Sequence, residues 1–156
     1  MTKVRGDGAN GADDRSAGPA RYEDFAHQAD AGIRGLGSSM AEAFSQAAMA
    51  LTAIVTDPAG VRALAPVDVH CDAPDDVTLF VDWINALIFE MSVRKMLFSR
   101  FEVKIERRRL SAIAWGEPVD RVRHEPAAEP KGATFTQALV RCDAAGHWIA
   151  QCVVDV

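Results

Sequence analysis

The sequence predicts an α+β fold: a compact two-layer arrangement in which a mostly antiparallel sheet carries two helices packed on one face. Two segments, residues 39–55 and 75–91, repeat apolar residues with the period of an α-helix. Shorter apolar runs that alternate with polar residues lie before, between and after them, which is typical of strands. The resulting order, two strands, a helix, a strand, a helix and then several strands, favours the α+β class.

The chain divides into a tail and one domain. Residues 1–20 are polar and rich in glycine, alanine and aspartate, so they cannot bury enough apolar surface to offset the entropy of ordering. We expect a disordered N-terminal tail at 1–20 and a single domain at 21–156. A domain of this size buries roughly 70% of the surface of its unfolded chain.

Three strands are expected in the first half of the domain. A short strand at 21–25 leads into a turn at 27–29, and apolar residues at 31, 33 and 36 indicate a second strand that glycines weaken. A third strand, "PVDVHC" at 66–71, places valines and a cysteine on one side and acidic residues and a histidine on the other.

Two helices are expected between these strands and the C-terminal half. Ser39 with Glu42 fits a capping box, and Pro58 closes the segment that follows. The second helix begins after Asp75 or Asp76, either of which suits an N-cap. Its apolar side chains cover most of its circumference, and Trp83 lies off the main stripe. This favours a helix packed between the sheet and its neighbour; the alternative is that Trp83 belongs to an exposed partner surface.

The C-terminal half is read as strands. They are expected at 97–107, 110–118, 133–142 and 147–156, with a loop at 119–131 and a turn at 143–146. In the last strand Trp148, Ala150, Cys152 and Val154 share the core face, and Asp155 points the other way.

Composition and charge exclude several classes of protein. A net charge of −5 argues against binding nucleic acid by bulk electrostatics, and the basic run at 107–109 is interpreted as a solvated hairpin turn. No apolar stretch reaches the length of a membrane span, and the N-terminus lacks the apolar core of a secretory signal. Three widely spaced cysteines match no metal or disulfide pattern, which favours a reducing cytoplasm.

Acidic groups at two strand ends are the first candidate site. His27 and Asp30 surround the first expected turn, and the chain ends with Asp155 and Val156 directly after an apolar strand. If the two strand ends meet, three carboxyl groups converge: Asp30, Asp155 and the α-carboxylate of Val156. Their repulsion would call for a cation, and oxygen-only ligands suit Ca²⁺, Mg²⁺ or Mn²⁺.

Other polar residues are weaker candidates. Glu117 and His124 are expected in the loop after a strand, and Lys131 precedes another strand, so each is a candidate partner-facing or supporting residue, as is His27. No nucleophile motif and no phosphate-binding glycine loop occurs in the sequence. We therefore do not expect an independent enzyme or catalytic residues.

With these residues in place, the chain resembles the archease family from residue 21 to residue 156. The segments that carry the resemblance are "RYEDFAHQADAGIRGLG", "AEAFSQAAMALTAIVTDP", "LFVDWINALIFEMSVRKMLFSRFEV", "AWGEPVDRVRH" and "CVVDV". The resemblance implies an archease-like fold and a cytoplasmic protein cofactor for an RtcB-type RNA ligase. That ligase joins RNA ends in tRNA splicing and RNA repair, and the family promotes guanylylation of its histidine and multiple turnover.

The resemblance also assigns residues. The metal-binding aspartate of the family's H-T-A-D motif corresponds to Asp30, and its C-terminal pair to Asp155 and Val156, with calcium as the implied ion. Two positions depart from the family pattern: Gln28 replaces the motif's threonine, and Thr136 replaces a histidine in a later loop that keeps its lysine and threonine. The ligase is the implied partner, with no direct contact to nucleic acid or membrane.

Two other functions are open at this stage. One is a general chaperone or a modulator of another nucleic-acid-modifying enzyme, which an exposed apolar patch around Trp83 would favour. The other is a metal-dependent hydrolase that uses the three carboxylates with His27 or His124 as base.

Overall fold

The computed structural model describes residues 20–27 and 30–156, so the predicted tail, apart from residue 20, lies outside the described residues. The strands are β1 (Arg21–His27), β2 (Asp30–Gly37), β3 (Ala65–Asp72), β4 (Met96–Glu106), β5 (Arg109–Pro118), β6 (Gly132–Cys142) and β7 (Trp148–Asp155). The helices are α1 (Met40–Val55), α2 (Asp76–Arg94) and the short α3 (Arg121–His124), with a 3₁₀ turn, η1, at Pro58–Gly60.

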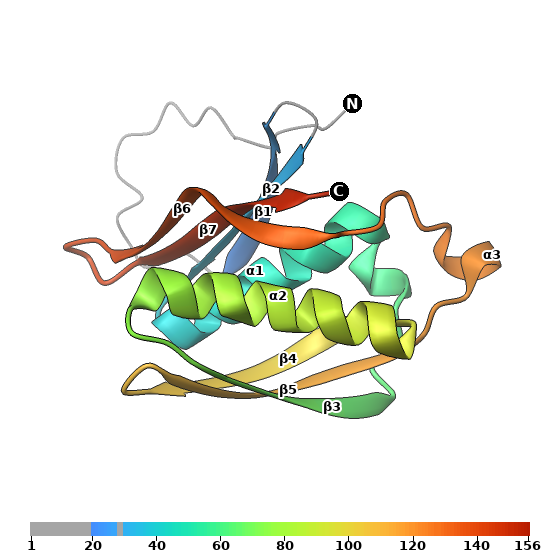
Figure 1. Ribbon diagram of the computed structural model, residues 1–156, viewed down its shortest axis with the longest axis horizontal. Coiled ribbons are helices and arrows are strands. Elements are labelled where there is room, and N and C mark those ends of the chain that lie inside the picture. Colours follow the sequence, from blue (N-terminus) through green and yellow to red (C-terminus); the bar gives the residue numbers. More distant parts are fainter. Residues whose placement is uncertain (1–19, 28–29) are drawn as a thin grey trace.

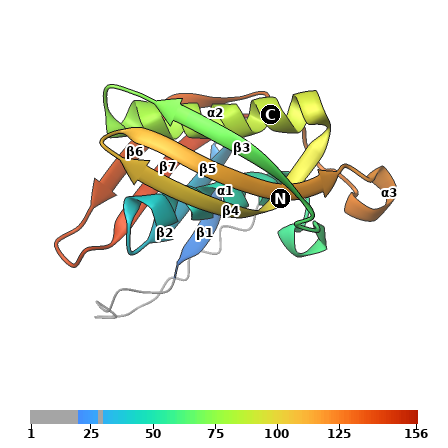
Figure 2. The same ribbon diagram turned by 90° about the horizontal axis from the view of Figure 1, so that it is seen from below.

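The strands form two antiparallel sheets. One has the order β1-β2-β7-β6 and the other the order β3-β5-β4. Figures 1 and 2 show α1 and α2 lying between the two sheets, so that each helix covers the inner face of both. The α+β class and the antiparallel pairing are confirmed. One sheet with two helices on one face was predicted, whereas the strands form two sheets with the helices between them, which makes three layers.

Helix α1 packs directly on β2. Ser39 caps it by accepting from the Glu42 amide, as the capping box predicts, while the Glu42 carboxylate accepts from the amide of Ser38. A Cβ at Gly35 would lie 1.9 Å from the carbonyl oxygen of Ala43. Only a glycine therefore lets the helix backbone approach the strand this closely.

Helix α2 is buried along most of its length. Asp75 is its N-cap and accepts from the Thr78 amide, 2.7 Å away. Trp83 is fully buried, packs edge-on against Phe101, and donates from Nε1 to the carbonyl of Phe44 at 3.0 Å. The prediction of a helix between a sheet and its neighbouring helix is confirmed, and Trp83 forms no exposed patch.

Differences from the predicted elements are local. Glu117 lies in strand β5 and not in the loop that follows it, because the pairing of β5 with β4 continues to Pro118. The predicted loop at 119–131 contains α3, which is too short for a periodic signal. Cys71, Cys142 and Cys152 are all free thiols. Among the described residues, no helix is long and apolar enough to cross a membrane.

Candidate functional site

The strand register brings Asp30 and the C-terminus to the same end of the four-stranded sheet. Ala31 pairs with Val154, so the next positions outward, Asp30 at the start of β2 and Asp155 at the end of β7, face each other. Cross-strand neighbours of an antiparallel pair have Cβ atoms about 5 Å apart and point to the same side. The register therefore brings these two residues, far apart in sequence, to the same end of the sheet, which we call the carboxylate end.

The last residues of the chain are held in place. Gly132 of β6 pairs with Asp155, and the Lys131 amide donates to the Asp155 carbonyl at 2.7 Å. The side chain of Val156 packs against the main core. Because of these contacts, Asp155 and Val156 are held in place at this end of the sheet.

A tightly packed row lies directly beneath the carboxylates on the outer face of the sheet. Phe25, Gly32, Val153 and Thr134 follow one another across the four strands. A Cβ at Gly32 would lie 2.1 Å from the ring of Phe25, so the ring occupies the space that a side chain would need. The Thr134 hydroxyl donates to the Val153 carbonyl at 2.9 Å. The packing of this row holds the strands that carry Asp30 and Asp155 at a fixed separation.

A charged network forms the next row. Arg34 donates to Gln151 at 2.8 Å and pairs with Glu23 at 2.7 Å, and its guanidinium lies 4.9 Å from the centre of the Phe25 ring. Sequence analysis missed this network, although the two-residue period from Asp30 to Arg34 and from Asp155 to Gln151 places both on one face. Glu23 and Gln151 therefore occupy the guanidinium of Arg34.

The carboxylate end is therefore without a described counter-ion. Among residues 20–26 and 30–156, no lysine, arginine or histidine side chain forms an ion pair with Asp30 or Asp155. Its described donors are carboxylate oxygens, which is the chemistry of a hard cation. Among the described residues, no three His, Cys, Asp or Glu side chains converge in a group that could hold a metal ion.

The remaining residues of this region are placed as follows. The backbone of His27 pairs with Asp30, while its side chain and the whole of Gln28 lie outside the described residues. Lys131 is exposed next to the carboxylate end. Thr136 lies in an irregular segment of β6 where the register with β7 shifts, and its amide donates to the Thr134 hydroxyl at 3.3 Å.

Glu117 and His124 form a separate, buried cluster at another part of the molecule. One oxygen of Glu117 accepts from the Arg62 amide at 2.5 Å and lies 3.2 Å from His124 Nε2, and the other oxygen bonds to Arg123. The Asp120 amide donates to His124 Nδ1 at 2.8 Å. Since Nδ1 accepts, the proton is on Nε2, which donates to Glu117. These contacts fasten α3 and its loop to the end of β5.

The protonation of Glu117 follows from these contacts. Burial by itself raises the pKa of its carboxyl group. The hydrogen bonds from the Arg62 amide, Arg123 and His124 outweigh that effect, and the pKa falls from 4.5 to about 2. Glu117 is an anion whose two oxygens accept hydrogen bonds from Arg62, Arg123 and His124. It is therefore suited to holding the loop that carries α3.

Comparison with known proteins shows the family of the chain. The Archease protein family (MTH1598/TM1083) matches residues 22–156. The chain is 34% identical to protein archease of Pyrococcus abyssi over 140 residues, which covers 87% of this chain and 99% of that protein. It is 33% identical to protein archease of Sulfurisphaera tokodaii over 138 residues, again 87% and 99%.

A solved structure shows the same fold. The solution structure of Methanobacterium thermoautotrophicum protein 1598 superimposes with a TM-score of 0.76 at 32% identity, covering 86% of this chain and 98% of that one. On the evidence of its sequence and its fold, the chain belongs to the archease family.

Proposed function

We propose that this protein activates an RtcB-type RNA ligase by promoting GTP-dependent guanylylation of the ligase's histidine, and so allows multiple turnover in tRNA splicing and RNA repair. Two findings support the proposal: membership of the archease family, and the placement of Asp30 opposite Asp155 by the register of β2 and β7. The second observation carries the proposal, because it supports a shared oxygen-donor site made by residues from the two ends of the domain.

The cofactor of this proposal is a divalent cation, and Ca²⁺ suits the site best. Asp30, Asp155 and the α-carboxylate of Val156 would hold it, and the absence of a described counter-ion fits that role. When bound, the ion supplies positive charge that relieves the repulsion among the three carboxylates. Mg²⁺ and Mn²⁺ share the same preference for oxygen and are the alternatives.

The chain's own residues supply rigidity. The row of Phe25 and Gly32, and the anchoring of Asp155 by Lys131 and Gly132, keep the carboxylate end in one conformation. A rigid carboxylate end favours one conformation of the ligase if it binds that conformation more tightly than the others. A difference of about 1.4 kcal/mol in binding free energy shifts such an equilibrium tenfold.

The chaperone and hydrolase hypotheses are less well supported by the structure. An exposed patch around Trp83 would favour the general chaperone hypothesis; Trp83 is fully buried, which weakens that hypothesis. The hydrolase hypothesis needs a base beside the carboxylates, and His124 is buried against Glu117 and Asp120, away from them. The side chain of His27, the other candidate base, lies outside the described residues. We propose a protein cofactor and not an enzyme on the basis of family membership.

Multiple-turnover RNA ligation tests the proposal. An RtcB-type ligase from the same source is assayed with excess RNA carrying 2′,3′-cyclic phosphate and 5′-hydroxyl ends, GTP and divalent cation, with and without catalytic amounts of this protein. We expect turnover to rise from about one to many, with more guanylylated ligase on a gel. Unchanged turnover and guanylylation would contradict the proposal, and phosphoester hydrolysis by this protein alone would favour the hydrolase.

A further inference from the structure

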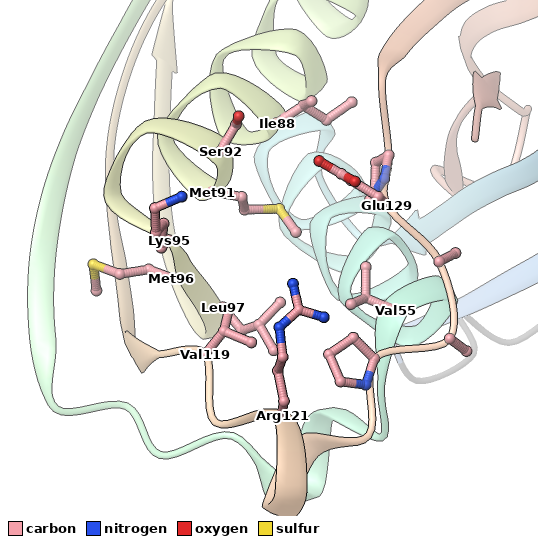
Figure 3. Close-up of a pocket in the computed structure, with 14 residues that line it drawn as sticks. Val55, Ile88, Met91, Ser92, Lys95, Met96, Leu97, Val119, Arg121 and Glu129 are labelled. Atoms are coloured by element: carbon pink, nitrogen blue, oxygen red, sulfur yellow. The ribbon is translucent and has the colours of Figure 1, made fainter.

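A cavity of about 440 Å³ lies apart from the carboxylate end and has no role in the function proposed above. It opens between the C-terminal half of α2, the end of α1 and the segment after β5 that carries α3 (Figure 3). Its volume is within the range of about 300–1,000 Å³ found for ligand pockets.

The floor of the cavity is apolar. It is formed by side chains from α1, α2, β4 and the segment after β5: Val55, Ile88, Met91, Leu97 and Val119. Figure 3 shows the thioether of Met91 directed into the cavity, and methionine adapts its shape to different apolar groups. Such a floor favours an apolar group as the occupant.

The rim is positively charged. Arg121 extends into the cavity from the side of α3, and Lys95 stands at the end of α2 (Figure 3). Neither forms an ion pair with another described residue, whereas Arg94 is paired with Glu90 and Arg123 with Glu117. Glu129 is the one carboxylate among the described lining residues. On a chain of net charge −5, this rim is a local site for an anion.

The walls are held before any ligand arrives. The Val119 amide donates to the Lys95 carbonyl at 2.9 Å, and the Ala127 amide to the Val55 carbonyl at 2.8 Å. Behind them the Thr56 hydroxyl donates to the His124 carbonyl at 2.6 Å, which joins the wall to the Glu117 cluster. A preformed pocket loses less free energy on binding, because its walls need no ordering.

We propose that this cavity is a docking site for an acidic segment of the partner ligase that carries an apolar side chain. The apolar side chain fills the floor, and neighbouring carboxylates pair with Arg121 and Lys95. The polar groups of the rim are long, exposed side chains, which suit an adaptable protein contact better than the fixed polar groups of a metabolite site. The proposal rests on the proposed function for the identity of the partner.

Exposed apolar residues extend the same surface. Val122 of α3, next to Arg121, is 88% exposed, and Phe89 and Val93 of α2 are 61% and 62% exposed. Phe89 and Val93 lie one turn apart on the helix row beside Ile88 and Ser92, which line the cavity. They would surround the anchored side chain and exclude water from it.

The experiment separates docking from activation. Two variants disturb the cavity independently: Arg121→Glu reverses the rim charge, and Ser92→Trp places a large side chain at its mouth. Arg141→Glu makes the same charge change at the far end of β6. We expect both cavity variants to raise the concentration of protein that gives half-maximal ligase turnover at least tenfold, with maximal turnover at saturation unchanged, and Arg141→Glu to alter neither value.

A second arm needs no ligase. The ¹⁵N-labelled protein is titrated with a blocked tetrapeptide of two leucines between two aspartates, and with the same peptide carrying lysines in place of aspartates. We expect the acidic peptide alone to shift amide signals of residues 88–97 and 119–130, and Arg121→Glu to abolish the shifts.

The outcomes are distinguishable. If wild-type protein fails to raise turnover, the proposed function fails, and the peptide titration still decides whether the cavity binds acidic segments. If wild-type protein activates but folded Arg121→Glu and Ser92→Trp do so at unchanged concentrations, the docking site is refuted. Equal shifts with both peptides, or shifts elsewhere on the protein, would refute the assigned chemistry.

Discussion

The Glu117 cluster and the carboxylate end differ in whether their carboxylates have hydrogen-bond and ion-pair partners within the protein. Glu117 is buried, and the Arg62 amide, Arg123 and His124 occupy its oxygens. The register brings Asp30 and Asp155 to one sheet end, and neither forms an ion pair with a described side chain. A carboxylate supplied with donors by its own chain is structural, whereas a pair left without them is available to an external cation.

Removing a charge at the carboxylate end should have the largest effect. In Asp30→Asn we expect ligase turnover to fall to the level seen without the protein, at least a tenfold loss, with an unchanged circular dichroism spectrum. Asp68→Asn, an exposed aspartate on the outer face of β3, is the matched control and should activate normally. An unfolded Asp30→Asn would instead assign Asp30 a structural role.

Removing the charge of Glu117 should affect stability and not activation. Glu117→Gln replaces an acceptor oxygen by an amide group that faces donors, which costs about 2 kcal/mol of unfolding free energy. Urea unfolding measures the loss, with Glu102→Gln, from an exposed pair with Arg100, as the control. If activation at saturating protein fell as far as in Asp30→Asn, the contrast between the two centres would be wrong.

A methyl group beneath the carboxylates should be destabilising. Gly32→Ala places a Cβ against the Phe25 ring, and overpacking of this kind costs about 1–3 kcal/mol. Gly60→Ala, where a Cβ meets nothing within 4 Å, is the matched control and should be near neutral. Thermal unfolding compares them; equal melting temperatures would show that the row of Phe25 and Gly32 does not position the site.

Acid should weaken the Glu117 cluster over a defined range. The pKa of Glu117 is about 2 in the folded protein and 4.5 ordinarily, so the unfolded state binds more protons between these values. Its contribution is complete above pH 4.5 and is lost as the pH falls toward 2. Urea unfolding across this range should show a smaller loss in Glu117→Gln than in the wild type; identical slopes would exclude Glu117 as the cause.

Helices and strands were predictable from the sequence where capping residues or apolar alternation mark them. The N-caps Ser39 and Asp75, and the alternation in β3 and β7, identify their elements directly from the sequence. The division into two sheets was not predictable, because strand partners such as β2 and β7 are separated by most of the chain. The four residues of α3 are too few for a periodic pattern.

The candidate site was predictable in part. The resemblance identifies Asp30, Asp155 and Val156, but their convergence depends on the pairing of Ala31 with Val154, which sequence spacing does not contain. The saturation of Glu117 by donors depends on the Arg62 amide, a contact 55 residues away in sequence. Residue type alone therefore does not distinguish Asp30 and Asp155, which lack a described ion-pair partner, from Glu117, whose oxygens accept hydrogen bonds within the protein.

Calorimetric titration with Ca²⁺ tests this contrast most directly. Wild-type protein, Asp30→Asn, Asp155→Asn and Glu117→Gln are titrated at low salt. We predict one site in the wild type and in Glu117→Gln, and at least tenfold weaker binding in both aspartate variants. Binding that survives in Asp30→Asn and Asp155→Asn, or no binding of Ca²⁺, Mg²⁺ or Mn²⁺ by the wild type, would contradict the assignment of the carboxylate end as the metal site.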